Sequence, residues 1–450
     1  MSIGWNDLPS PSQRWWGVPE LAAMRRDYLA FIGKQQRLGD IVRLRILNEC
    51  TVDLFDPELI RAAMVDHADA LIRWERGPAV FAQLMGQSVL VTEGATWQRQ
   101  RRMLMQAFTP KKVAGYAELM LRATDEGLAA VQAGEVAMAP LFSHLAMDVI
   151  LRTLFTAPAA PHTQKLADAV QLLSDQALRA MFWPASLPDW LPLPGKAAKR
   201  RAHRLMHDLI QRHIDDRAGR PQTSDDLLGM LLALRDSDTL QGLSAREVYD
   251  QCMVSFTAGH ETSATALTWW SALLAGHPDA QQRARAEVDA VLGGRAPGPE
   301  DLAALPYLSA TLKEAMRLYP PIAALMTRRT TREIVLGDAR LPARTMIRIT
   351  PWLLHRDPRW WPSEPEAFRP ERFLADAPDA ILRGAYIPFG LGPRVCLGQH
   401  FAVLEMSLIA VRMLQRFHLH PVGALPLPRL AVTLRPADGV VLRLQARDSK

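Results

Sequence analysis

A cysteine near the C-terminus lies in a stretch whose residue types could do chemistry. Residues 387–398 read IPFGLGPRVCLG, so Cys396 has glycines on both sides and Arg394 two positions before it. A thiolate can be a nucleophile or a metal ligand. The glycines let the backbone turn sharply and let a bulky group approach closely, and Arg394 could hold an anion beside the thiol. The pattern therefore predicts a nucleophile or a ligand to one face of a metal.

The residues after this loop indicate a helix. Apolar side chains recur at intervals of three and four, at Phe401, Leu404, Leu408 and Val411, which places them on one helix face. Unpaired backbone N–H groups and the positive end of the dipole at a helix N-terminus favour a thiolate. Cys396 is thus expected where its charged form is stabilised.

The loop resembles the haem-binding loop of the cytochrome P450 family. The pattern F-x-x-G-x-R-x-C-x-G is matched by Phe389, Gly392, Arg394, Cys396 and Gly398. The resemblance implies that Cys396 is the axial thiolate ligand of the iron of haem b. It also implies that Phe389, Arg394 and Gly398 contact this cofactor. The alternative is a buried, inert cysteine beside a glycine-rich turn.

A second stretch predicts a long helix with an unusual centre. Ser244 and Glu247 form a capping box at its start, and Gly276-His277-Pro278 ends it. About 30 residues at a rise of ~1.5 Å each would span roughly 45 Å. The centre reads AGHETS over residues 258–263, and a glycine there costs about 1 kcal/mol relative to alanine. Some compensating contact or function is expected.

These central residues match the family's Ala/Gly-Gly-x-Asp/Glu-Thr-Thr/Ser signature. The resemblance implies that the helix opens locally beside the haem, where O2 binds, with Ala258 against the cofactor. Thr262 would donate a hydrogen bond to bound dioxygen, and Glu261 would relay protons from solvent. A hydroxyl and a carboxylate suit these roles. The alternative is an ordinary buried helix that contains a glycine.

Glu314 and Arg317 lie three residues apart near the end of another predicted helix, which stops at Pro320-Pro321. In most proteins such a pair is a surface salt bridge worth under about 1 kcal/mol. Together with Arg372 the pair resembles the family's buried Glu-Arg-Arg network, in which Glu314 and Arg317 bond to Arg372. The resemblance implies a structural role behind the cysteine loop.

Three further residues match family positions that reach the haem propionates. Trp97 and Arg101 are four apart on one helix face, and an indole N–H and a guanidinium are good donors to a carboxylate. Arg328 matches a third such position, although its neighbour Arg329 competes for the assignment. A surface aromatic–cation pair would explain Trp97 and Arg101 equally well.

Basic residues gather in the same region, at Arg99, Arg101, Arg102, Lys111 and Lys112. If the family arrangement holds, they lie near the cysteine side of the haem, and some of them attract an acidic redox partner, a ferredoxin or a flavodoxin. The alternative is a solvated helix face.

Composition and pattern bound the fold class. The chain has 450 residues, 48% of them hydrophobic, and no linker, repeat or low-complexity run divides it, so one domain over residues 1–450 is expected. Helical patterns dominate, with short strands near 41–47 and 51–55. The resemblance implies the cytochrome P450 fold, which is mainly α with a small β region and has the form of a helix-rich triangular prism.

Net charge and the number of cysteines indicate where the protein is located and which classes of partner it has. The net charge of +6 comes without a dense basic tract, so no nucleic-acid partner is expected. The N-terminus lacks a signal pattern, and no uncharged apolar run of about 18 residues predicts a membrane span. Three distant cysteines fit a reducing compartment. We expect a cytoplasmic monomer.

Three functions remain in comparison. The first is a monooxygenase that inserts one oxygen atom of O2 and takes electrons from separate proteins, since no flavin or NADPH domain follows Lys450. The second is a peroxide-using haem-thiolate enzyme, whose members tend to replace the acid–alcohol pair that Glu261 and Thr262 retain. The third is a non-catalytic haem sensor, which needs no proton relay. The first is favoured.

The expected substrate is a lipophilic small molecule, either a fatty acid or a natural-product scaffold. Its pocket walls are expected from residues near 75–90, the segment 170–195, the Glu261 helix and two apolar turns. The named candidates are Ala258, Ile322, Ala323, Ala324, Leu325, Val432 and Thr433. The proline-rich segment 182–194 is where the family's mobile access lid would lie.

Overall fold

The computed structural model describes residues 3–13, 15–157, 163–181, 195–218, 226–324, 326–377 and 380–447. Contacts divide the chain into two compact units. The sheet unit comprises Met1–Pro78, Arg317–Ala367 and Ala377–Cys396, and the helical unit comprises Ala79–Met316, Phe368–Asp376 and Leu397–Lys450. Each unit is built from segments distant in sequence. The single domain expected over residues 1–450 stays a prediction.

Helices dominate the described residues, as expected. They are α1 (Val18–Arg26), α2 (Tyr28–Gln36), α3 (Pro57–Arg61), α4 (Arg76–Met85), α5 (Gly94–Met105), α6 (Pro110–Ala114), α7 (Ala117–Ala129), α8 (Met138–Phe155), α9 (Thr163–Met181), α10 (Lys196–Ala218), α11 (Leu227–Ala233), α12 (Ala245–Ala275), α13 (Pro278–Leu292), α14 (Pro306–Leu318), α15 (Pro351–Leu354) and α16 (Gln399–Arg416).

The strands form small sheets. They are β1 (Ile41–Ile46), β2 (Glu49–Leu54), β3 (Leu71–Arg73), β4 (Gly134–Ala137), β5 (Met326–Thr330), β6 (Ile334–Leu336), β7 (Ala339–Leu341), β8 (Met346–Ile349), β9 (Phe417–Pro421), β10 (Pro428–Leu430), β11 (Leu434–Pro436) and β12 (Val441–Ala446). The fold is mainly α with a small β region, which confirms the predicted fold class.

The sheet unit is organised by a five-stranded sheet in the order β1-β2-β8-β5-β3. The two strands predicted from residues 41–55 are β1 and β2, which pair antiparallel, and β2 then runs parallel to β8. Alternation along β1 buries Val42, Leu44 and Ile46 on one face. The sheet supplies β5, which carries Arg328, and packs on a core that includes Ile387 at the start of the cysteine loop.

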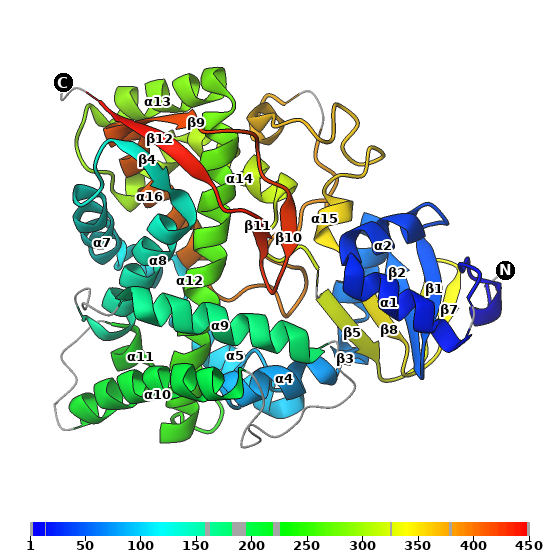
Figure 1. Ribbon diagram of the computed structural model, residues 1–450. Helices are drawn as coiled ribbons and strands as arrows, with labels where there is room; N and C mark the ends of the chain where they lie inside the picture. The colour runs from blue at the N-terminus through cyan, green and yellow to red at the C-terminus, as the bar shows by residue number, and fades with distance from the viewer. Residues whose placement is uncertain are drawn as a thin grey trace. The chain divides into compact units, whose positions relative to one another are not determined.

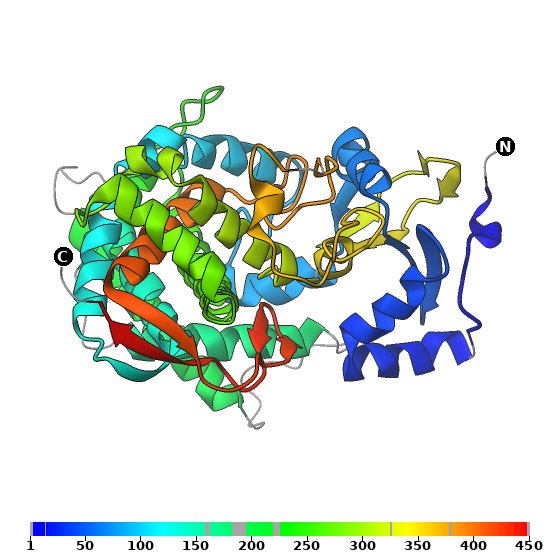
Figure 2. The ribbon, with the colours of Figure 1, turned by 90° about the horizontal axis from the view of Figure 1, so that it is seen from above.

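The helical unit is built around α12. Its N-terminus is the predicted capping box, in which Ser244 Oγ accepts from the Glu247 N–H and the Glu247 carboxylate accepts from the Ser244 N–H. Helix α8 lies beside α12 in Figure 1. Both α16 and β9, in orange in Figure 2, contact α12, which is drawn in green. Because neighbours cover it on most sides, most residues of α12 are buried, including polar ones such as Gln251 and His260.

One described helix, α8, is long and apolar enough to cross a membrane by length and composition. In the structure 72% of it is buried, and Asp148 and Arg152 form an ion pair of 3.0 Å within it. Its close packing against α12 makes it a core element of the helical unit.

Candidate functional site

The cysteine loop folds back on itself through three backbone hydrogen bonds. The N–H groups of Gly390, Val395 and Cys396 donate to the carbonyls of Ile387, Gly392 and Phe389, at 3.0, 3.0 and 2.9 Å. Gly392 has a φ of +78°, and a Cβ there would lie 2.0 Å from the Met64 carbonyl oxygen. Glycine is therefore required at this position, both for the conformation and for the close approach.

The environment of Cys396 differs from that of the other cysteines. Its side chain is exposed, whereas Cys50 is half-buried and Cys252 is buried. Burial raises the pKa of the Cys252 thiol, so that thiol stays protonated. Helix α16 starts three residues after Cys396, and its predicted apolar face is buried at Phe401, Leu404, Leu408 and Val411. An exposed thiol on a glycine-shaped loop before a helix fits a ligand for one face of a metal.

His355 supports this loop from behind. It is fully buried, and its Nε2 accepts from the Ile387 N–H at 2.9 Å while its Nδ1 lies 3.2 Å from the Arg317 carbonyl. Nε2 must therefore be the unprotonated nitrogen, so Nδ1 carries the hydrogen and donates it. His355 is a structural residue that fixes where the cysteine loop begins.

Arg317 is buried and bonds to backbone carbonyls of the sheet unit. Its guanidinium donates to the carbonyls of His355 and Pro365, each at 2.7 Å, and of Ala367 at 3.1 Å. The prediction that Arg317 bonds to Arg372 needs correction, because guanidiniums carry only donors. Arg317 instead satisfies carbonyls behind the cysteine loop, and this agrees with a structural role.

Glu314 meets the predicted arginine in the helical unit. It is fully buried and accepts from the Arg372 Nε at 3.4 Å and from the Arg369 N–H at 2.9 Å. Removing one partner of a buried ion pair costs about 3–5 kcal/mol, because the other charge is left without compensation. The Glu314–Arg372 contact thus anchors residues 368–373 to the end of α14.

A strip of α12 stays uncovered at the predicted centre. Most residues of this helix are buried, but Ala258 is exposed and Ser255, Gly259 and Thr262 are half-buried. These positions differ by three and four and form one helix face. The structure also gives a reason for Gly259, whose presence in a helix lowers helix stability. A Cβ at this position would lie 2.8 Å from Cδ1 of Ile150 on α8. Glycine lets the two helices approach closely.

The predicted local opening of this helix is not found. Helix α12 is continuous from Ala245 to Ala275. The Thr262 hydroxyl donates to the Ala258 carbonyl at 2.8 Å, a bond back along the helix that satisfies the hydroxyl within the regular fold. To donate to another acceptor, the hydroxyl must exchange this partner.

Glu261 is held by partners that its own neighbourhood in sequence does not reveal. The Thr433 hydroxyl and the Arg435 guanidinium both donate to Oε1 of Glu261, each at 2.6 Å. Arg435 also donates to Asp175 on α9 at 3.0 Å. Thr433 is 1% exposed, so its hydroxyl is committed to Glu261. The sequence analysis missed Arg435 and Asp175, which are 174 and 86 residues away along the chain.

Two more ionisable groups interact with this part of α12: His260 on the helix itself and Glu405 on α16. Burial lowers the pKa of His260 to about 4, so its ring is neutral near pH 7, with Nε2 3.2 Å from the Ser143 hydroxyl. Ser263 donates to Glu405 on α16 at 2.6 Å, and burial raises the pKa of Glu405 to about 8. The sequence analysis named neither His260 nor Glu405 as a site residue.

The candidate propionate ligands are partly covered. Trp97 and Arg101 are both half-buried and lie one turn apart on α5. On β5, Arg329 is buried and pairs with Glu49 and Glu75, at 2.8 and 2.6 Å, whereas Arg328 is half-buried on the opposite face and donates to the Thr327 carbonyl. Arg329 is therefore committed to the structure, which favours Arg328 of the two.

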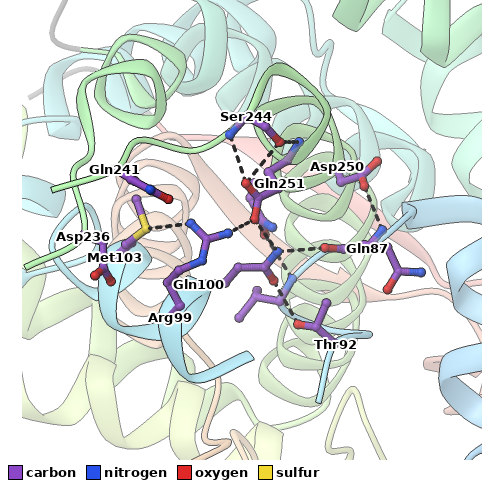
Figure 3. Close-up of polar contacts among 12 residues, drawn as sticks. Gln87, Thr92, Arg99, Gln100, Met103, Asp236, Gln241, Ser244, Asp250 and Gln251 are labelled. Atoms are coloured by element: carbon purple, nitrogen blue, oxygen red, sulfur yellow. Dashed lines mark hydrogen bonds and ion pairs between the residues drawn. The ribbon is translucent and has the colours of Figure 1, made fainter. Parts of the chain in front are cut away.

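The basic cluster is partly neutralised by acidic side chains. Arg99 pairs with Glu247, so it ties α5 to the first turn of α12, and Figure 3 shows Arg99 and Gln100 directed at the region of Ser244. Arg102 pairs with Asp236 at 2.8 Å, and this hydrogen bond lowers the pKa of Asp236 to about 2. Arg99 and Arg102 thus have acidic partners within the chain, and the prediction that some of the five basic residues attract an acidic partner stays a prediction. Lys111 and Lys112 on α6 are exposed.

The predicted substrate walls are found in different environments. Ala323 and Ala324 are buried, while Ile322 and Val432 are half-buried. Leu325 and the expected lid at 182–194 lie outside the described residues. A pocket of about 250 Å³ opens between α4, α10 and the start of α12, lined by residues that include Leu84, His203, Arg204, His207 and Arg246. This lining is more basic than the apolar wall expected near residues 75–90.

Comparison with known proteins identifies the family of the chain. The family model described as Cytochrome P450 matches residues 9–440. Cyclooctatin synthase of Streptomyces melanosporofaciens is 34% identical over 424 residues, covering 92% of this chain and 91% of the relative. Cyclooctat-9-en-7-ol 5-monooxygenase of the same organism is 33% identical over 405 residues, covering 89% and 87%. Pentalenene oxygenase of Streptomyces avermitilis is 32% identical over 402 residues, covering 88% and 87%. The chain belongs to the cytochrome P450 family and is a monooxygenase that uses haem b and O2.

Proposed function

We propose that this monooxygenase oxidises a lipophilic natural-product scaffold, by hydroxylation or epoxidation, with electrons from a separate acidic ferredoxin or flavodoxin and its reductase. The observation that carries the proposal is the centre of α12. There an uncovered strip with Thr262 lies next to a carboxylate, Glu261, that buried side chains hold in place. A hydroxyl and a carboxylate adjacent on one helix are suited to proton delivery.

The residues that would hold the cofactor are those that the family pattern indicates. Cys396 would be the thiolate ligand, and Phe389, Arg394 and Gly398 of the same loop would contact the haem. Trp97, Arg101 and Arg328 would donate to its propionates, and Ala258 would also contact it. A thiolate-ligated haem supplies an electron-rich iron that favours O–O bond cleavage.

The protein's own residues would hold and move protons. Glu261 takes a proton from solvent and passes it on, and the Thr262 hydroxyl gives up its bond to the Ala258 carbonyl to act as the final donor. His260 is neutral near pH 7 because burial holds its pKa at about 4, so it adds no positive charge beside Glu261.

The substrate class follows from relatives and from the walls. The names of two relatives contain an alkene, pentalenene, and an unsaturated alcohol, cyclooctat-9-en-7-ol. The described wall residues Ile322, Ala323, Ala324 and Val432 are apolar. A mostly hydrocarbon substrate would pair apolar surface with apolar surface. A fatty acid is the second candidate. It would require a cation for its carboxylate, and Arg204, which lines the α4–α10–α12 pocket, is the candidate for that.

The proposed redox partner is acidic. Lys111 and Lys112 are exposed on α6, and exposed charges steer association over about 8–10 Å at ordinary ionic strength. The same surface would accept a ferredoxin or a flavodoxin, because both would be recognised by negative charge. We propose a monomeric, cytoplasmic enzyme.

The alternative functions make different demands on Glu261 and Thr262. A peroxide-using enzyme receives its oxygen already reduced, so it needs no delivery of protons to dioxygen. A sensor needs no turnover at all. The retained acid–alcohol pair and the buried groups that hold Glu261 favour the monooxygenase over both.

The direct test of the cofactor ligand is the Cys396→His variant. The wild-type protein, reduced and treated with carbon monoxide, should show the long-wavelength Soret band of a thiolate-ligated haem. Cys396→His should lose that band, and the matched control Cys50→Ser should keep it. If Cys396→His kept the band, another residue would be the ligand.

A further inference from the structure

The β10–β11 hairpin supplies the groups that hold Glu261. Its strand β11 contacts α12, and Figure 1 shows the hairpin beside that helix. Thr433 in the turn and Arg435 on β11 donate to the same oxygen, Oε1, and Arg435 Nε also lies 3.3 Å from the Thr433 hydroxyl. Two donors from one hairpin therefore converge on one carboxylate oxygen.

The second oxygen of Glu261 is treated differently. Among the described residues, no hydrogen bond to Oε2 is found, and Glu261 is 8% exposed. A carboxylate held at Oε1 keeps a fixed orientation while Oε2 can take and release a proton. The geometry thus separates the oxygen that is positioned from the oxygen that can carry the proton.

Arg435 has two acidic partners of unequal burial. The Glu261 side chain is 10% exposed, and Asp175, whose Oδ1 is 3.0 Å from Arg435, is 34% exposed. With both carboxylates ionised, the three groups carry a net charge of −1, and protonation of Glu261 brings the charge to zero. Asp175 therefore keeps the guanidinium in an ion pair when Glu261 is neutral, and the cluster can accept one proton without leaving a buried charge unpaired.

We propose that Arg435 is a positioning residue for proton delivery: together with Thr433 it fixes Oε1 of Glu261, so that the proton travels on Oε2, and Asp175 retains the guanidinium while Glu261 is protonated. The inference rests on the relay proposed for Glu261 and adds to it the residues that set its geometry and charge. A proton is gained and lost at Oε2, and Arg435 stays charged throughout.

The other ionisable groups nearby are accounted for. His260 precedes Glu261 on α12, and its pKa of about 4 leaves it neutral. Glu405 on α16 bonds to Ser263. Arg429 lies opposite Arg435 in the hairpin register and is exposed. Arg429 has no hydrogen bond or ion pair in the described part of the chain, which makes it the matched control.

The first experiment asks whether Arg435 and Glu261 are paired, and it does not depend on turnover. We would measure the unfolding temperature of the holoenzyme for Arg435→Gln, for Glu261→Gln and for the double variant. If they are paired, both single changes remove the same contact, so the double variant should be destabilised by less than the sum of the two. Strictly additive shifts would overturn the pairing.

The second experiment asks whether the pairing positions a proton. Arg435→Gln should reduce product per NAD(P)H several-fold, because Oε1 of Glu261 then loses one of its two donors. Arg435→Lys, which keeps a cationic donor at this position, should restore most of the product per NAD(P)H. Arg429→Gln should match the wild type.

Each outcome bears on one claim. If wild-type enzyme forms product and Arg435→Gln leaves the product per NAD(P)H unchanged, the positioning role is overturned while the monooxygenase stands. The substrates tested would be a panel of hydrocarbon natural-product scaffolds and fatty acids. If the wild type forms no O2-dependent product with any of them, the proposed function fails, and the unfolding temperatures still decide whether Arg435 and Glu261 are paired. Should Arg435→Gln fail to bind haem, the comparison of Arg435→Lys with Arg429→Lys decides the positioning role by the same measurement of product per NAD(P)H.

Discussion

The cysteine loop and the Glu261 cluster achieve their geometry in different ways. The loop is fixed by backbone bonds among residues 387–396 and by glycines with positive φ. Glu261 is held by Thr433 and Arg435 of the β10–β11 hairpin, and Arg435 is held in turn by Asp175 of α9. Only the tertiary fold brings these segments together. The cysteine loop is thus held by local, steric interactions, and Glu261 is held by electrostatic interactions between segments that are distant in sequence.

The difference has a consequence for sensitivity to conditions. Backbone bonds and steric fit do not titrate, so the cysteine loop should respond to substitution but little to pH. The acidic and basic groups around the centre of α12 should respond to pH because their charges change. The following predictions probe that contrast.

The largest effect is expected from Gly392→Ala in the loop. The new Cβ would lie 2.0 Å from the Met64 carbonyl oxygen, and φ of +78° is itself unfavourable for alanine by about 1–2 kcal/mol. The backbone must shift, and Cys396 with it, so we expect loss of most bound haem. The measurement is haem content per protein. The control is Gly439→Ala, which has a φ of +74° but no atom within 4 Å of the added Cβ.

A smaller, pH-dependent effect is expected from Glu405→Gln. Burial raises the pKa of Glu405 from 4.5 to about 8, so between these values the unfolded chain releases a proton that the folded chain keeps. Stability supplied by this group is present below pH 4.5 and is lost as pH rises towards 8. At about 1.4 kcal/mol per pH unit, the free energy of unfolding lost over this range is at most roughly 5 kcal/mol.

The glutamine variant cannot ionise but can still accept from Ser263. Its unfolding temperature should therefore fall less between pH 5 and pH 8 than that of the wild type. Glu118→Gln, at an exposed position on α7, should follow the wild type. Equal pH dependence in wild type and Glu405→Gln would contradict the assignment of a protonated Glu405.

The contrast also explains how much the sequence could predict. The capping box at Ser244, the apolar face of α16 and the strands β1 and β2 depend on nearby residues, and all were predicted correctly. Glu314 with Arg372 was predicted from a family motif rather than from spacing. Asp175, Arg435 and Glu405 carry no local pattern, because an ion pair between distant segments leaves no trace in periodicity.

Exposed charge was the least predictable feature. Arg99 and Arg102 belong to a basic run in the sequence, yet Glu247 and Asp236 pair with them from segments more than 130 residues away. A run of like charge predicts an attractive surface only where the fold brings no opposite charge to it. Local motifs were therefore enough to predict the cysteine loop, whereas the pairing of charged side chains depends on the tertiary fold.

The smallest effect is expected on the surface. Reversing the charge of Lys111 and Lys112 to Glu should slow reduction by an acidic ferredoxin or flavodoxin at low salt, and the difference should shrink as salt rises. Haem content and unfolding temperature should change little, because both side chains are exposed. A rate of reduction that is indifferent to salt and to both substitutions would remove these lysines from the docking surface.

The most direct test of the central claim is the coupling of Thr262→Ala. Alanine keeps the helix and removes the hydroxyl that donates to the Ala258 carbonyl. Product and peroxide per NAD(P)H should be measured in wild type and variant with saturating redox partner. We predict normal haem and substrate binding, continued electron consumption, less product and more peroxide in the variant. Unchanged product per NAD(P)H would contradict the role of Thr262 in proton delivery.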